Sequence, residues 1–183
     1  MSILFINACV REHSRTLVLA RDVLRNLSGE VVEVNLNQEN IAPLNRELLQ
    51  KREQQIRRGN TDDAIFHYAK QFAQADEIVV AAPYWDLSFP ALLKIYLEQI
   101  TVSGITFHYE DGRPRGLCRA KRLTYVTTSG GPIFADFGYE YVKALAKNFY
   151  GIGETKAYRA MNLDVNEISA EDVFTKAEIS VIE

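Results

Sequence analysis

The chain has 183 residues, of which 47% are apolar and 25% charged, and its formal net charge is -3. This length allows one globular domain with a sizeable core, which we place at residues 1–183. The acidic balance argues against a nucleic-acid binder, no apolar run reaches the ~18 residues of a membrane span, and two cysteines are too few for a disulfide framework.

The first half of the chain alternates between strand and helix patterns. The N-terminus, MSILFINA, has no basic segment before its apolar run, which argues against a signal peptide and leads us to expect a cytoplasmic protein. Short apolar runs predict strands, and helical spacing of apolar residues predicts helices. We expect strands at 3–6 and 30–36, and helices at 17–27, 45–58 and 62–74.

The second half continues the alternation. An unbroken apolar run predicts a strand at 77–83, buried on both faces. Further strands are expected at 122–129 and 155–161, and helices at 91–101, 138–151 and 169–179. The long connection 103–122 contains Asp111 and Gly112, which favour a hairpin turn.

This alternation predicts the fold class. Strands that alternate with helices form a parallel sheet covered on both faces. Ligands of such sheets lie beyond the carboxyl ends of the strands. Three loops reach that edge, at 8–15, 83–89 and 129–137, and we expect them to contain the functional site.

The first loop, NACVREHSRT, is suited to an anion. Ser14, Arg15 and Thr16 begin the first helix, where unpaired N–H groups and the helix dipole favour negative charge. Arg11 and Arg15 add planar donors that fit phosphate. The alternative is that Ser14 is a helix cap and the arginines are solvated. Neither a Walker A sequence nor a G-x-G-x-x-G fingerprint is present.

The second and third loops are suited to a flat ligand. The sequence APYWDLSFP presents Tyr84 and Trp85, which can lie along a planar ring or, alternatively, cap the sheet or form a subunit interface. The sequence TTSGG follows another strand, and its glycines either bring backbone N–H donors close to a ligand or form an ordinary turn. Together, the features of the three loops predict a binding site for a mononucleotide with a flat head group.

The motifs along these loops resemble the flavodoxin-like NAD(P)H-dependent oxidoreductases, which include FMN-dependent azoreductases and NAD(P)H:quinone reductases. The similarity covers nearly the whole chain except residues 36–62. The matching segments are Ala82-Pro83, Leu93-Lys94-Ile95-Tyr96, Gly104-Ile105-Thr106-Phe107 and Ser129-Gly130-Gly131. The chain departs from the azoreductase pattern in its first loop, which is usually serine-rich but here has Arg11, His13 and Arg15, and at Asp86, where asparagine is common.

The resemblance implies a flavodoxin-like fold with a five-stranded parallel sheet in the order 2-1-3-4-5. It also implies bound FMN, with FAD less expected, NAD(P)H as co-substrate, and a homodimer with flavin sites near the interface. The apolar residues of the helix after Pro90 are more than one core-facing stripe requires, which favours such an interface. The implied cofactor-binding residues are Arg11, Ser14, Arg15, Thr16, Pro83, Tyr84, Trp85, Asp86, Leu87, Thr128, Ser129, Gly130 and Gly131.

The function implied is transfer of a hydride from NAD(P)H through flavin to a quinone, an azo compound or a similar small acceptor. The flavin carries this chemistry, so we assign no catalytic side chain. An electron-carrying flavodoxin is the alternative, and a flavin-free binding module is a third possibility, because a fold does not fix a function. His13, His67 and His108 lack metal-ligand spacing, so we expect no metal.

Overall fold

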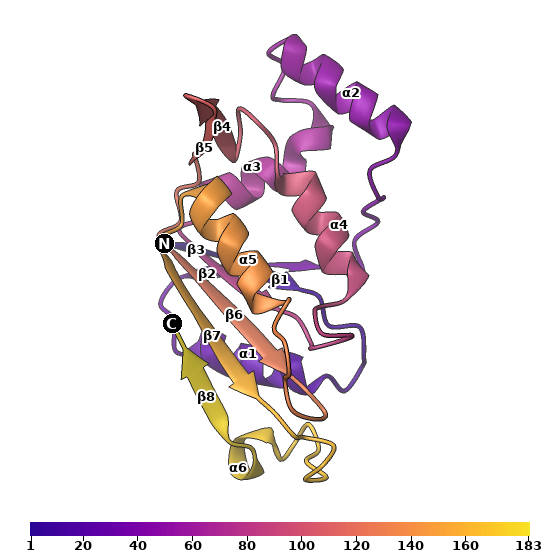
Figure 1. The fold of residues 1–183 in the computed structure, drawn as a ribbon, viewed down its shortest axis with the longest axis vertical. Coiled ribbons are helices and arrows are strands. Elements are labelled where there is room, and N and C mark those ends of the chain that lie inside the picture. Colours follow the sequence, from indigo (N-terminus) through magenta and orange to yellow (C-terminus); the bar gives the residue numbers. More distant parts are fainter.

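The computed structural model describes residues 1–183 (Figure 1). Its elements in chain order are β1 (Ser2–Asn7), α1 (Arg15–Arg25), β2 (Glu30–Asn35), α2 (Arg46–Arg57), a 3₁₀ turn (Ala64–Phe66), α3 (His67–Gln74), β3 (Glu77–Ala81), α4 (Ala91–Ile100), β4 (Phe107–Glu110), β5 (Arg113–Gly116), β6 (Arg122–Thr128), α5 (Tyr139–Leu145), a π-helical turn (Ala146–Tyr150), β7 (Glu154–Ala160), α6 (Val173–Lys176) and β8 (Ile179–Ile182).

The main sheet has six strands in the order β2-β1-β3-β6-β7-β8. The first five run parallel, as predicted, and their spatial order is that of the 2-1-3-4-5 pattern. β8, however, runs antiparallel to β7, so the prediction of a five-stranded, wholly parallel sheet was wrong. The helix predicted at 169–179 was also wrong in extent, because only Val173–Lys176 is helical. The β-branched segment Ile179–Ile182 instead pairs with the free edge of β7.

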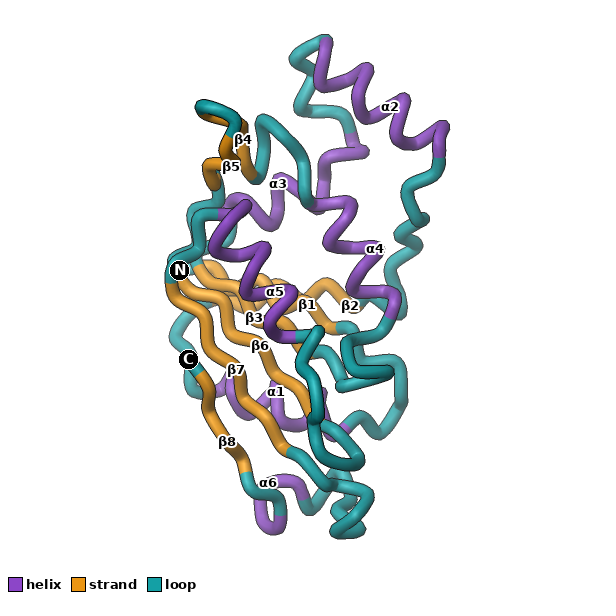
Figure 2. Tube along the Cα trace, viewed as in Figure 1, coloured by secondary structure: helices purple, strands orange, loops and turns teal.

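Helices cover both faces of this sheet (Figure 2). One core, of 27 buried residues, lies between the sheet and α3, α4 and α5. A smaller core of 13 buried residues lies under α1 and α6. β3 is buried along its whole length, which explains the unbroken apolar run at 78–81 that follows Glu77. α1 turns Leu19, Ala20 and Val23 toward the smaller core, at the spacing of one helical face.

Two elements project from this body. α2 lies at the end of the molecule away from the sheet and buries none of its residues (Figure 1). The β4–β5 hairpin turns at Asp111 and Gly112, as predicted, and both residues have positive φ angles. No helix combines the length and the apolar character needed to cross a bilayer.

Apolar residues of α4 pack against the core of the same chain. Leu93, Tyr96, Leu97 and Ile100 are all buried in the larger core. The residue count that favoured a subunit interface on this helix therefore has an explanation inside one chain. α5 and its π-helical turn end at Gly151, which has a left-handed φ of 75°, as the glycine led us to expect.

Candidate functional site

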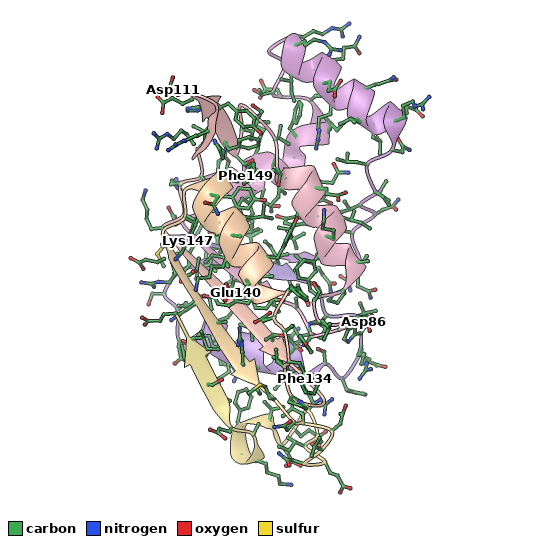
Figure 3. All side chains as sticks on the ribbon, viewed as in Figure 1. Asp86, Asp111, Phe134, Glu140, Lys147 and Phe149 are labelled. Atoms are coloured by element: carbon green, nitrogen blue, oxygen red, sulfur yellow. The ribbon has the colours of Figure 1, made fainter.

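A pocket lies beyond the carboxyl ends of β1, β3 and β6, where the sequence placed the site. Its enclosed volume is about 140 Å³. The lining residues are Val10, Arg11, His13, Ser14, Arg15, Thr16, Pro83, Tyr84, Trp85, Thr128, Gly130 and Asp164. Figure 3 shows Asp86 and Phe134 on loops at this end of the sheet, whereas Asp111 lies at the opposite end.

The first loop presents the N-terminus of α1 to the pocket. Ser14 caps the helix, because its Oγ accepts a hydrogen bond of 3.2 Å from the Leu17 N–H. The N–H groups of Arg15 and Thr16 donate to no other backbone group. The helix therefore offers two free N–H donors at the positive end of its dipole, together with the remaining hydrogen of the Ser14 hydroxyl.

The Thr16 hydroxyl already has a protein partner. It lies 2.7 Å from the hydroxyl of Thr128, and both residues are buried. This hydrogen bond joins the first turn of α1 to the end of β6, so it sets the distance between the first and third loops. Thr16 thus contributes its backbone N–H to the pocket, while its side chain supports the pocket wall.

The second loop is a tight turn. Trp85 and Ser88 exchange two backbone hydrogen bonds, of 3.1 and 2.7 Å. Asp86 and Leu87 lie between them with φ angles of 50° and 67°, as in the type I′ turns that favour Asn-Gly. Leucine in this region is strained, and such strain concentrates at functional sites. Asp86 and Leu87 are at the tip of the turn and do not line the pocket.

Hydrogen bonds brace the second loop against the third. The Tyr84 hydroxyl donates to the carbonyl oxygen of Ala135 over 2.9 Å. The Phe137 N–H donates to the carbonyl oxygen of Leu87 over 3.0 Å. The turn tip, although outside the pocket, therefore holds the two loops together.

Arg11 lies on the aromatic side of the pocket. Its guanidinium carbon is 5.9 Å from the centroid of the Trp85 ring, within the range of a cation–π interaction. The sequence grouped Arg11 with Arg15 as phosphate donors. The structure separates them, because Arg15 belongs to α1 and Arg11 packs over the second loop.

The third loop supplies backbone donors at its glycines. The Ser129 N–H donates a hydrogen bond to the Ala160 carbonyl oxygen, and the Ser129 hydroxyl donates to the Gly131 carbonyl oxygen over 2.5 Å. Neither the Gly130 nor the Gly131 N–H donates to another backbone group. A Cβ at Gly131 would have open space around it. Ser129 is therefore structural in its contacts, and the glycines leave N–H groups free.

A partly buried ion pair anchors the far end of this loop. Asp136 pairs with Arg159 on β7, and the two side chains are 11% and 13% exposed. The other oxygen of Asp136 accepts from the N–H groups of Gly138 and Tyr139 at the start of α5. Asp136 thus fixes both the loop and the helix that follows it.

Asp164 is a pocket residue that the sequence reasoning missed. Its carboxylate Oδ1 lies 2.6 Å from Arg15 Nη2, and its N–H donates to the Gly130 carbonyl over 2.9 Å. The residue follows β7, whose carboxyl end lies at the same edge as the other loops. The rule that selected three loops therefore also covered this fourth segment, and applying it after the fifth strand would have found Asp164.

The two cysteine thiols are buried and unreactive at neutral pH. Burial raises the pKa of Cys9 to about 11, although a hydrogen bond with the Ser14 hydroxyl lowers this pKa by a smaller amount. Cys9 lies two residues after the end of β1. Burial alone raises the pKa of Cys118 to about 12. Both thiols are therefore protonated at neutral pH, and neither is a nucleophile there.

The assembled pocket fits a phosphorylated planar ligand. One wall offers free N–H groups and Arg15 for phosphate, a second offers the Tyr84 and Trp85 rings, and a third offers glycine N–H groups. Four residues assigned to the site from the sequence do not line the pocket: Asp86, Leu87, Ser129 and Gly131.

Comparison with known proteins identifies the family of the chain. The family model described as "Flavodoxin-like fold" matches residues 1–181. A protein of Clostridium perfringens named FMN-dependent NADH:quinone oxidoreductase is 32% identical over 180 residues, covering 93% of this chain and 90% of that protein. A protein of the same name from Lachnoclostridium phytofermentans is 37% identical over 140 residues, covering 74% of this chain and 70% of its own.

Solved structures agree on the fold. An azoreductase from Bacillus anthracis superposes with a TM-score of 0.78 at 22% identity, covering 96% of this chain and 93% of its own. An FMN-dependent NADH-azoreductase from the same species, solved with FMN, gives a TM-score of 0.74 at 21% identity, covering 90% of this chain and 88% of its own.

Proposed function

This chain belongs to the flavodoxin-like fold family, and we propose that it is an FMN-dependent oxidoreductase that passes a hydride from NADH to a quinone, an azo compound or a similar small acceptor. The relatives named NADH:quinone oxidoreductase support both the activity and the choice of NADH as donor. NADPH is the alternative donor that the sequence left open.

One observation carries this proposal. Arg15 and Thr16 with their free N–H groups at the start of α1, the Tyr84–Trp85 pair, and Gly130 with its free N–H group all line one pocket at the carboxyl edge of the sheet. FMN has a phosphate, a ribityl chain and a flat ring system, and this arrangement offers each of them a matching surface.

The chain's residues have distinct roles in this proposal. Ser14, Arg15 and the N–H of Thr16 bind the phosphate. Pro83, Tyr84 and Trp85, with Arg11 over the Trp85 ring, flank the ring system. Gly130 donates its N–H group to the polar edge of the ring, and Gly131 lies next to it outside the pocket lining. Thr128 and Ser129 support these groups through the contacts described above, and Asp86 and Leu87 shape the second loop. Such fixed donors favour negative charge that develops beside them.

When bound, FMN supplies the group that accepts and releases the hydride. The protein orients this group and excludes water on its buried side, so no side chain is assigned as an acid or a base. We keep the cytoplasm as the proposed compartment, and we propose a homodimer. The resemblance implied an interface near the flavin sites, but the apolar residues of α4 are used in the core of one chain, so we place the second copy on α2 instead. No residue of α2 is fully buried within one chain.

The proposal is tested with purified protein and two measurements. FMN added to the flavin-free chain should show quenched fluorescence on binding, and the loaded protein should oxidise NADH when a quinone such as menadione is present. FMN binding without NADH oxidation would favour the electron carrier. Absence of any flavin binding would contradict both and favour a flavin-free module.

A further inference from the structure

Asp164 places a carboxylate where the phosphate site meets the glycine loop. Its Oδ1 is 2.6 Å from Arg15 Nη2. Its Oδ2 lies so close to Gly130 that a Cβ there would be 1.9 Å from it. The side chain therefore fills the corner of the pocket between α1 and the third loop, and glycine at position 130 makes room for it.

Two anions would compete at this corner. The α1 N-terminus and Arg15 favour a phosphate, yet Arg15 already binds the carboxylate of Asp164 and the carbonyl oxygen of Ile168 over 3.1 Å. A dianionic phosphate beside an ionised carboxylate is repelled by it. Both groups cannot use the same face of the guanidinium at full strength.

The Asp164 side chain can leave without moving the backbone. It is 69% exposed, whereas Arg15 is 19% exposed. The surrounding segment is fixed by backbone hydrogen bonds from Leu163 and Asp164 to the third loop. Rotation of one side chain into solvent would free Arg15 and enlarge the pocket, whose 140 Å³ is below the roughly 300–1,000 Å³ of typical ligand sites.

We propose that Asp164 and the cofactor phosphate exchange as partners of Arg15, so that Asp164 limits the affinity for phosphorylated flavin. This inference rests on the proposed function, since it assigns a residue at the same site. Its distinctive consequence is that removing a carboxylate from the pocket tightens FMN binding. Riboflavin, which lacks the phosphate, does not need Arg15 and should be indifferent to the change.

The test compares FMN and riboflavin titrations, followed by flavin fluorescence, of the full flavin-free chain. Asp164→Asn should lower the Kd for FMN about fivefold, the size of a partly exposed charge interaction, and leave riboflavin within about twofold. When Arg15 is replaced by glutamine (Arg15→Gln), Asp164→Asn should change the Kd for FMN by less than half of that roughly fivefold factor. Asp62→Asn is the matched control, because it removes the same charge from an exposed pair with Lys70 remote from the pocket.

Two results would overturn the inference. If Asp164→Asn weakens FMN and riboflavin alike, the carboxylate accepts hydrogen bonds from the ribityl chain instead. If the FMN affinity is unchanged, the pair does not compete with phosphate. Thermal unfolding of each variant, with Asp164→Ala as a second substitution, establishes that the affinities refer to folded protein. Failure of the unsubstituted chain to bind either flavin would instead refute the proposed function, and this inference with it.

Discussion

Thr16 at the start of α1 and Thr128 at the end of β6 are joined by a hydroxyl–hydroxyl hydrogen bond of 2.7 Å. The residues are 112 positions apart in the sequence, and both are buried. The bond ties the phosphate-facing loop to the glycine loop. Because a buried hydroxyl without a partner is costly, the two side chains depend on each other.

A double-mutant cycle measures this dependence. Thr16→Val or Thr128→Val alone leaves one buried hydroxyl unpaired, and each should lower the free energy of unfolding by about 1–3 kcal/mol. The double variant removes both hydroxyls, so its loss should be smaller than the sum of the single losses. Urea denaturation of the four proteins gives the coupling. Additive losses would show that the hydrogen bond contributes nothing.

Ser14 should affect both stability and flavin binding. Ser14→Ala removes the α1 cap and should cost about 0.5–2 kcal/mol of stability. It should also weaken FMN binding about tenfold, because a donor to a charged phosphate is lost. Asn45→Ala is the matched control, since Asn45 caps α2 through a 2.9 Å hydrogen bond from Leu48 but lies outside the pocket. Equal FMN affinities for the two variants would refute the phosphate assignment.

The Asp136–Arg159 pair should cost more to break than the exposed Glu110–Arg115 pair. Asp136→Ala leaves a largely buried guanidinium without its partner and removes the acceptor at the start of α5. We expect a loss of about 3–5 kcal/mol in the free energy of unfolding. Glu110→Ala breaks the exposed pair with Arg115 and should cost about 0–1 kcal/mol. Similar losses in chemical denaturation would contradict the anchoring role of Asp136.

The buried thiols should make the protein less stable in alkali. Their pKa values are raised by burial from 9.0 to about 11 for Cys9 and about 12 for Cys118. Above pH 9 the unfolded chain loses protons that the folded chain retains, so stability is complete below pH 9 and falls as pH rises toward the folded pKa values. The fall should approach about 1.4 kcal/mol per pH unit for each thiol.

Denaturation between pH 9 and pH 10 measures this slope, to which the buried tyrosines add increasingly as the pH approaches 10. The pKa values of Tyr96, Tyr125 and Tyr150 are also raised, mainly by burial, from an ordinary value of 10.0. Cys9→Ala and Cys118→Ala should each flatten the slope. An unchanged slope in the double variant would show that other groups determine the alkaline instability.

The assembly is predicted to depend on α2. No residue of this 12-residue helix is fully buried in one chain. Its apolar side chains Leu49 and Ile56 are 39% and 37% exposed, respectively. Isolated helices of this length are only marginally stable, so a second copy that packs on α2 would stabilise it. Light scattering should give about twice the 20.8 kDa of one chain. Leu49→Glu with Ile56→Glu should shift the mass toward the monomer, whereas Val31→Glu on β2 should not.

The sequence alone determined the alternation of parallel strands with helices and the edge at which the site lies, whereas the strand order 2-1-3-4-5 came from the resemblance to flavodoxin-like oxidoreductases. Apolar runs such as 78–81 and the helical spacing of Leu19, Ala20 and Val23 are local patterns, which can be read without knowing neighbours in space. The alternation of elements then restricted the topology, because parallel strands need crossover helices. The phosphate-facing loop and the aromatic loop followed from that topology.

Tertiary structure alone decided the contacts between distant segments. The chain end at Ile179–Ile182 became an antiparallel strand because β7 has a free edge beside it, which no local pattern of residues 169–179 reveals. Arg11 packs on Trp85, whereas Arg15 pairs with Asp164 from beyond β7. From the sequence alone, each of these arginines could have paired with any of several acidic or aromatic residues. Packing selected one, because a buried or half-buried group must satisfy its charge and hydrogen bonds with whatever the folded chain brings within reach.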